Sequence, residues 1–145
     1  MSDDDVASAA GRLLAGFDFA RAMAASDEAH RRETEALLCS FLEVVDSLEA
    51  LERHTSGHAD DALHKTVERI LGQAYGVLAR AGVERLVLAG LALDLAYTEV
   101  VDVRVNDQHA DDTVLEEIVR GYRWRNRLLR RAKVVISRNE GTPAA

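Results

Sequence analysis

The sequence is poor in the features that mark secreted and membrane-spanning proteins. It contains a single cysteine, Cys39, which excludes an internal disulfide and fits a reducing compartment. No stretch approaches the roughly 20 apolar residues that a membrane span needs. The chain begins MSDDDVAS, which is acidic where a signal peptide would be basic. We therefore expect a cytoplasmic protein that does not associate with membranes.

Catalytic and cofactor signals are also missing. Cys39 lies inside an apolar helical run, no serine occupies a glycine-flanked elbow, and there is no glycine-rich phosphate loop. His54, His58 and His64 cluster around one loop, but their spacing matches no common zinc pattern. We expect a protein that is not an enzyme, with no catalytic residues, no metal site and no cofactor.

Charge is distributed unevenly along the chain. The formal net charge is −7, which argues against a general nucleic-acid-binding or membrane-surface protein. Residues 1–60 carry 13 acidic and 5 basic side chains, whereas residues 120–138 carry 8 basic and no acidic ones. A local basic face on an acidic body indicates a partner with a defined acidic surface.

Residues 26–82 show the periodicity of a helical hairpin. Ser26 fits a helix N-cap, and two apolar stripes follow it at helical spacing. A second periodic run ends at Gly82, which favours the left-handed conformation found just after a helix. Residues 1–25 contain two glycines within an alanine-rich run, so we expect this segment to be weakly ordered.

The paired stripes predict a dimer. Two adjacent stripes on one helix exceed what a single partner helix covers, and two helices alone bury too little apolar surface. We therefore expect a four-helix bundle that a second copy of the chain completes. The residues expected at this dimer interface are Leu38, Phe41, Val45, Leu48, Val67 and Ile70.

After Gly82 the sequence period changes from helical to strand-like. Short β-branched runs separated by polar loops extend over residues 83–138, which predicts a small all-β domain. Residues 139–145 are expected to form a disordered tail. Helices followed by strands place the chain in the α+β class.

The basic residues are concentrated at the end of the β region. If the chain is extended from Arg127 onward, alternation divides its side chains between two faces. One face holds Arg127, Leu129, Arg131 and Lys133, and the other holds Leu128, Arg130, Ala132 and Val134. Two interpretations stay open: the basic face binds a partner, or it is a solvated edge whose charges prevent aggregation.

Four segments in this order resemble the GrpE family. Leu42–Glu49, LEVVDSLE, is similar to the family's LPVVDNLE, and Gly82-Val83-Glu84 resembles the family's exit from helix to β-domain. Gly90–Val101 aligns without gaps with a segment of the form GEPFDPNLHEAV, and Gly121–Val134 aligns with GYKLHGRVIRPARV. The resemblance covers about residues 37–137.

This resemblance implies a fold and an activity. GrpE proteins are homodimers with a paired helical stalk, a four-helix bundle and two β-domains. They are co-chaperones that act in protein folding and the stress response: one β-domain opens the nucleotide cleft of a DnaK-type heat-shock chaperone so that ADP leaves. The chain departs from the family where Leu93, Leu95 and Thr98 replace the usual Phe, Pro and His. The family's long stalk is also expected to be missing or reduced to residues 1–25.

The resemblance assigns two groups of residues. Those expected to contact the chaperone's ATPase domain are Tyr122, Arg127, Leu129, Arg130 and Lys133. Those expected to hold the β-domain in shape are Gly90, Asp94, Glu99 and Gly121, and alternation turns Arg130 toward a carboxylate such as Asp94 or Glu99. Two other functions stay open: a dimeric adaptor that no longer drives exchange, or an RNA- or anion-binding module that uses the arginines of residues 120–138 with Trp124.

Overall fold

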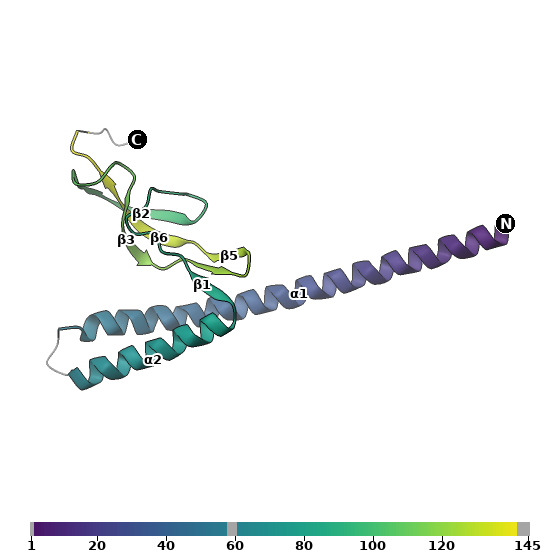
Figure 1. The fold of residues 1–145 in the computed structure, drawn as a ribbon, viewed down its shortest axis with the longest axis horizontal. Coiled ribbons are helices and arrows are strands. Elements are labelled where there is room, and N and C mark those ends of the chain that lie inside the picture. The colour runs from purple at the N-terminus through teal and green to yellow at the C-terminus, as the bar shows by residue number, and fades with distance from the viewer. Residues whose placement is uncertain (1, 58–60, 142–145) are drawn as a thin grey trace. The chain divides into compact units, whose positions relative to one another are not determined.

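The computed structural model describes residues 2–57 and 61–141, and it divides into two compact units, residues 1–40 and 41–145 (Figure 1). His58 lies outside the described residues. From Asp3 onward the first unit is helical and belongs to helix α1, Asp3–Thr55, which continues into the second unit. The second unit holds the rest of α1, helix α2 and all the strands.

Helix α1 begins much earlier than Ser26, so the predicted N-cap is wrong and residues 3–25 are helical rather than weakly ordered. Ser2 caps the helix instead: its Oγ accepts from the Asp5 amide and its own amide donates to the Asp5 carboxylate, both at 3.3 Å. Three aspartates in the first turn interact favourably with the positive end of the helix dipole. These terms and the many alanines outweigh two glycines, each of which costs about 1 kcal/mol relative to alanine.

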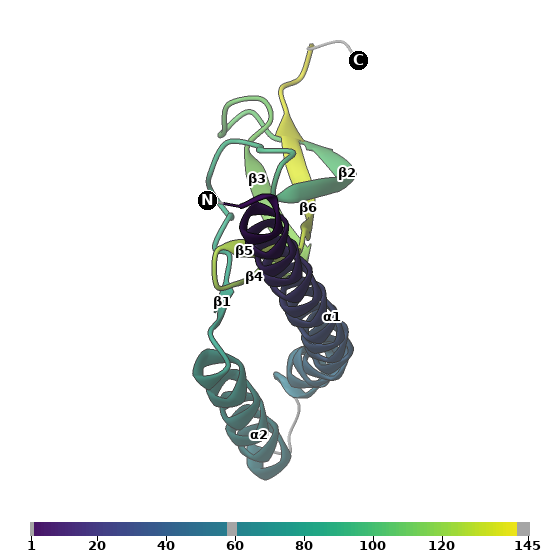
Figure 2. The same ribbon diagram turned by 90° about the vertical axis from the view of Figure 1, so that its right-hand side faces the viewer.

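Helix α2, Asp61–Arg80, runs back beside the C-terminal part of α1, as both views show (Figures 1 and 2). The two helices bury facing stripes: Leu42 and Val45 from α1, and Val67, Leu71, Ala74 and Leu78 from α2. Gly82 follows α2 with φ of 82°, and its amide donates to the Ala79 carbonyl at 3.0 Å. The predicted hairpin and its glycine terminator are therefore present.

The β-domain contains two three-stranded sheets. The first has the order β1-β4-β5, where β1 is Val83–Arg85, β4 is Tyr122–Trp124 and β5 is Arg127–Arg130. The second has the order β2-β6-β3, where β2 is Thr98–Val105, β3 is Val114–Val119 and β6 is Ala132–Arg138. The central strand β6 is parallel to β2 and antiparallel to β3. Figure 2 shows β1 leading from α2 into this domain. The α+β class is confirmed.

The basic segment is not one strand. The chain leaves the first sheet after Arg130 and enters the second at Ala132, so Arg131 lies between two strands of different sheets. The alternation predicted from Arg127 therefore does not hold: Leu128 is exposed and Leu129 is partly buried. The β4–β5 pairing also shifts register between Tyr122 and Arg123, which alters the alternation further.

The core of the β-domain forms around β6. Ala132, Val134 and Ile136 are buried with Val114 of β3, and Leu88, Leu93 and Val100 pack against them. Leu93, which replaces the family's Phe, thus helps to cover this core. At the end of the domain the expected tail is partly wrong, because the Asn139 and Glu140 amides donate to Asp111 and Asp107 at 2.6 and 2.8 Å. Residues 142–145 lie outside the described residues.

Candidate functional site

The β-domain is tied to the helical hairpin by an arginine–carboxylate pair. Arg130 of β5 donates from both terminal nitrogens to Asp46 of α1, at 2.7 and 2.9 Å. The same guanidinium donates to the Arg120 carbonyl at 3.1 Å from Nε and 2.8 Å from Nη2. Arg130 therefore bonds to Asp46 and not, as expected, to Asp94 or Glu99. Bidentate geometry of this kind fixes direction as well as distance.

A second linkage joins both helices to the β-domain. Glu49 of α1 is buried, accepts a 2.5 Å hydrogen bond from the Tyr75 hydroxyl of α2, and forms a 3.1 Å ion pair with Arg120. Arg120 also donates to the Tyr75 hydroxyl at 2.7 Å. Burial and then the hydrogen bond to Glu49 raise the pKa of Tyr75, so its hydroxyl stays protonated and can donate. Tyr75 and Arg120 thus pair the carboxylate of Glu49, whose burial without a partner would cost free energy of folding.

Tyr122 belongs to the same junction and is not a surface residue. It is 2% exposed, and the guanidinium of Arg130 lies 5.5 Å from the centre of its ring. Burial and the nearby Glu49 charge raise the pKa of its hydroxyl. Tyr122 and Arg130 therefore pack the β-domain against the hairpin, and their role as chaperone contacts stays a prediction.

Three basic side chains are exposed close to the point where the chain passes from the first sheet to the second: Arg127, Arg131 and Lys133. Leu129 lies partly buried beside them on β5. Arg123 is also exposed but is paired with Glu84 at 2.5 Å, and this hydrogen bond raises its pKa. We use the name exposed basic face for Arg127 on β5, Arg131 between the sheets and Lys133 on β6, which are exposed and close in sequence.

The turn between β4 and β5 has no aromatic side chain available for stacking on a base. Trp124 is 5% exposed, and its indole N–H donates to the Ala81 carbonyl at 2.9 Å. The ring thus anchors β4 to the end of α2. The residue with positive φ at the turn is Arg125, at 54°, and its guanidinium lies 4.9 Å from the Trp124 ring centre. The RNA-binding alternative, which needed Trp124 as a platform, is left with the arginines alone.

The residues expected to hold the β-domain differ in their surroundings. A Cβ at Gly121 would lie 2.8 Å from the Ala132 amide nitrogen, so only glycine allows β4 and β6 to approach this closely. Gly90 has φ of 83°, and its amide donates to Val114 at 2.8 Å. Asp94 bonds to the Ala96 amide at 2.9 Å and shapes the loop before β2. Glu99 is exposed opposite Lys133 in the β2–β6 register.

The expected dimer residues divide between two environments. Val45 and Val67 are buried within the chain, so neither is available to a second copy, and Leu38, Phe41 and Leu48 are partly buried. Ile70 is exposed. The apolar side chains that the second unit leaves exposed on its helices are Val44, Leu51, Leu63, Ile70 and Val77. They recur at seven-residue intervals, and of these five only Ile70 was expected at the dimer interface.

Sequence reasoning missed Asp46, Glu49, Tyr75 and Arg120 as functional side chains. A signal for Glu49 was present, because it follows Val45 by four residues and so shares its face of the helix. A carboxylate within a buried apolar stripe predicts a cationic partner. Nothing in the sequence identified that partner as Arg120 of the β-domain.

The sequence model of the GrpE family matches residues 5–138, which include α2, all the strands named above and α1 except for its first two residues. The chain belongs to the GrpE family. The expected resemblance is confirmed, and the match begins far ahead of residue 37.

Curated relatives agree with this assignment. The chain is 35% identical over 136 residues to Protein GrpE of Synechococcus sp. (strain CC9902), covering 90% of this chain and 60% of the relative. It is 32% identical to Protein GrpE of Prochlorococcus marinus (strain MIT 9303), covering 90% and 56%, and 30% identical to that of Parasynechococcus marenigrum (strain WH8102), covering 92% and 63%. The chain thus spans about three fifths of the length of these relatives. Among the described residues, neither helix combines the length and apolar character that crossing a bilayer requires.

Proposed function

We propose that this chain acts as a co-chaperone that accelerates ADP release from a DnaK-type chaperone. The observation that carries the proposal is the family match over residues 5–138, a range that includes the helical hairpin and the β-domain. The mechanism needs no chemistry on this chain. A factor that binds the open nucleotide cleft more tightly than the closed one shifts the chaperone toward the open state, and ADP then dissociates.

The junction between hairpin and β-domain supports this mechanism. A protein that holds a cleft open must transmit force from one contact to another without bending. The Asp46–Arg130 pair and the Glu49–Tyr75–Arg120 cluster fix the β-domain on the hairpin with charge-assisted hydrogen bonds. We infer that this junction gives the β-domain its rigid orientation as it enters the cleft.

The exposed basic face is the surface that we propose contacts the chaperone. Arg127, Arg131 and Lys133 lie on the domain that the mechanism places in the cleft, and the rest of the chain is acidic. Complementary charge of this kind increases the association rate and orients the encounter. Leu129, partly buried beside these side chains, supplies apolar surface at the edge of the same face.

We also propose that the chain dimerises through its hairpin. Val44, Leu51, Leu63, Ile70 and Val77 give each helix of the second unit a stripe of apolar side chains that are 39–53% exposed. Water-exposed stripes at this spacing on both helices are typical of a bundle that a second hairpin completes.

Binding measured with and without nucleotide tests the exchange function against the adaptor alternative. Linkage is reciprocal: if this chain weakens ADP binding, then ADP must weaken the binding of this chain by the same factor. We expect tight binding to the nucleotide-free chaperone and a clear loss of affinity when ADP is added. Equal affinity in both states would identify an adaptor without exchange activity.

A further inference from the structure

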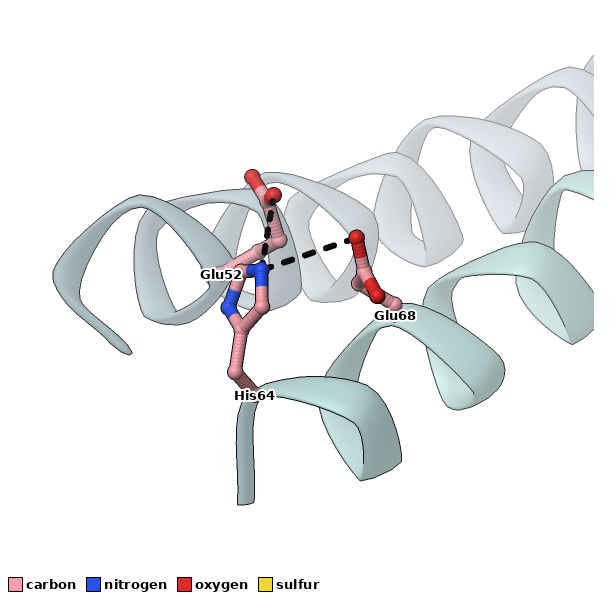
Figure 3. Close-up of side chains that lie close together, drawn as sticks. All are labelled: Glu52, His64 and Glu68. Atoms are coloured by element: carbon pink, nitrogen blue, oxygen red, sulfur yellow. Dashed lines mark ion pairs between the residues drawn. The ribbon is translucent and has the colours of Figure 1, made fainter. Parts of the chain in front are cut away.

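The turn end of the helical hairpin carries a cluster of three potential metal ligands. Glu52 comes from the last turns of α1, and His64 and Glu68 lie one turn apart on α2 (Figure 3). One ligand atom from each residue lies within 4.8 Å of the others. The His64 Nε2 is 3.5 Å from the Glu68 Oε1 and 4.0 Å from the Glu52 Oε1. The cluster therefore joins the two helices on either side of their connecting loop.

Hydrogen bonding at the other ring nitrogen decides what Nε2 presents to the carboxylates. The Thr55 hydroxyl has one proton, which it donates to the Glu52 carbonyl at 3.1 Å. With its proton on that carbonyl, the hydroxyl accepts from the His64 Nδ1, which lies 3.0 Å away, in the tautomer that carries the proton on Nδ1. In the neutral ring Nδ1 carries the proton and Nε2 carries a lone pair. That lone pair faces two carboxylates, an arrangement that needs a cation among the three groups.

A divalent metal ion fits this arrangement. A metal-ligating histidine usually donates its second ring N–H to an oxygen acceptor, which fixes the tautomer, and Thr55 supplies that acceptor here. Ligands about 2.1 Å from a tetrahedral zinc ion lie about 3.4 Å apart. The 3.5 Å separation between His64 Nε2 and Glu68 Oε1 is close to this value, whereas the 4.0 Å separation from Glu52 Oε1 is wider and must shorten when an ion binds. The Glu68 side chain is 56% exposed, so it can adjust its position with little steric resistance.

We propose that Glu52, His64 and Glu68 form a site for a divalent transition-metal ion such as Zn²⁺. One imidazole and two carboxylates suit zinc and its neighbours better than magnesium, which prefers oxygen ligands alone. Water fills the remaining coordination position. The bound ion links α1 to α2 at the turn and stabilises the hairpin, because binding to the folded state alone raises the free energy of unfolding.

The sequence concealed this site. Histidine spacing around the loop matches no zinc pattern because only one histidine takes part. The other two ligands are glutamates, and one of them lies on the preceding helix. A four-residue spacing between His64 and Glu68 places both on one helix face, but it does not indicate Glu52.

Zinc titration of the full chain by calorimetry tests the proposal. We expect one saturable Zn²⁺ site per chain, a visible absorption band typical of four-coordinate Co²⁺ when cobalt is substituted, and a thermal midpoint that rises with Zn²⁺ and falls back with chelator. His64→Gln and Glu68→Gln should each lower the affinity at least about tenfold, since each removes one ligand. Excess Mg²⁺ should not compete.

Asp61→Asn is the matched control, because it removes a carboxylate from the same helix at a side chain that is 71% exposed and paired with Lys65. It should leave zinc affinity unchanged. Glu68→Gln keeps the test valid if His64→Gln unfolds the turn. If no saturable site is found, or if the affinity of the folded Glu68→Gln variant matches that of the unmutated chain, the cation between these groups is a proton on His64 and the proposal is wrong.

Discussion

Asp46 of α1 and Arg130 of β5 form a two-pronged ion pair across the junction between hairpin and β-domain, with N–O distances of 2.7 and 2.9 Å. Asp46 lies in the segment LEVVDSLE, and Arg130 lies in the segment that begins Gly121-Tyr122. The two segments that most resemble the GrpE family in sequence are thus bonded to one another in space. Their shared task is to hold the β-domain on the helices.

Arg130→Ala should destabilise the second unit. The substitution leaves Asp46 and the Arg120 carbonyl without their donor, which costs about 1–3 kcal/mol. Denaturant unfolding of Arg130→Ala, Asp46→Ala and the double variant measures the coupling between the two side chains. Arg131→Ala is the control, because Arg131 is exposed and its substitution should change stability by less than about 0.5 kcal/mol. Additive effects of the two single substitutions would contradict a direct interaction.

The Tyr75 hydroxyl predicts a loss of stability in alkali. Burial and Glu49 raise its pKa above the ordinary value of about 10, so the folded state binds this proton more tightly than the unfolded state does. Stability is therefore complete below about pH 10 and falls as the pH rises further. Tyr75→Phe should have a flatter stability profile from about pH 10 upward, measured by urea unfolding. An unchanged slope would show that the hydroxyl is not preferentially protonated in the folded chain.

The dimer proposal predicts opposite outcomes for two aspartate substitutions on α2. Ile70 is exposed, so Ile70→Asp should leave the hairpin folded and yield monomers. Val67 is buried against α1, so Val67→Asp should unfold the chain, because the charge has no partner there. Sedimentation and circular dichroism separate the two results. A folded monomer from the unmutated chain at micromolar concentration would refute dimerisation through this face.

The second unit should fold without residues 1–25. This segment is helical, but its side chains are almost entirely exposed. A chain that begins at Ser26 should therefore keep its thermal midpoint within a few degrees of the parent, measured by differential scanning calorimetry. A large loss of stability would show that the segment is packed in the assembled protein.

The sequence predicted the elements of this fold better than their contacts. Helical periodicity located the hairpin and Gly82 located its end, because both depend on local backbone preference. The start of α1 was missed, since alanine propensity and the Ser2 cap outweighed Gly11 and Gly16. The predicted alternation of side chains between two faces did not hold after Arg127, because the chain passes from one sheet to the other at Arg131. Such a passage depends on strand pairing with residues that are distant in the sequence.

The candidate site shows the same division. Arg127 and Lys133 are exposed as expected, whereas Tyr122 and Arg130 are engaged with the hairpin. A cationic side chain on a strand has the same sequence pattern whether it meets solvent, a partner or a carboxylate of its own chain. Only the fold reveals that Asp46 lies within reach of Arg130.

The proposed contact surface predicts that charge reversal removes activity without unfolding the chain. Arg127→Glu combined with Lys133→Glu should abolish stimulated ADP release, because each charge at a partly desolvated contact contributes about 1–3 kcal/mol. Thermal unfolding should stay close to that of the parent, since both side chains are exposed. Arg12→Glu together with Arg21→Glu, on exposed positions of the first unit, is a control with the same charge change. Full activity in the Arg127→Glu/Lys133→Glu variant would show that the exposed basic face does not contact the chaperone and would favour the alternative that its charges prevent aggregation.

The central claim is tested most directly by the rate at which a DnaK-type chaperone releases fluorescent ADP, followed by stopped flow with increasing amounts of this chain. The account predicts that the release rate rises with concentration to a plateau, and that Arg127→Glu/Lys133→Glu remains at the spontaneous rate while Arg12→Glu/Arg21→Glu behaves like the parent. A release rate that does not change at saturating concentration of a folded chain that binds the chaperone would contradict nucleotide exchange and leave the adaptor function in its place.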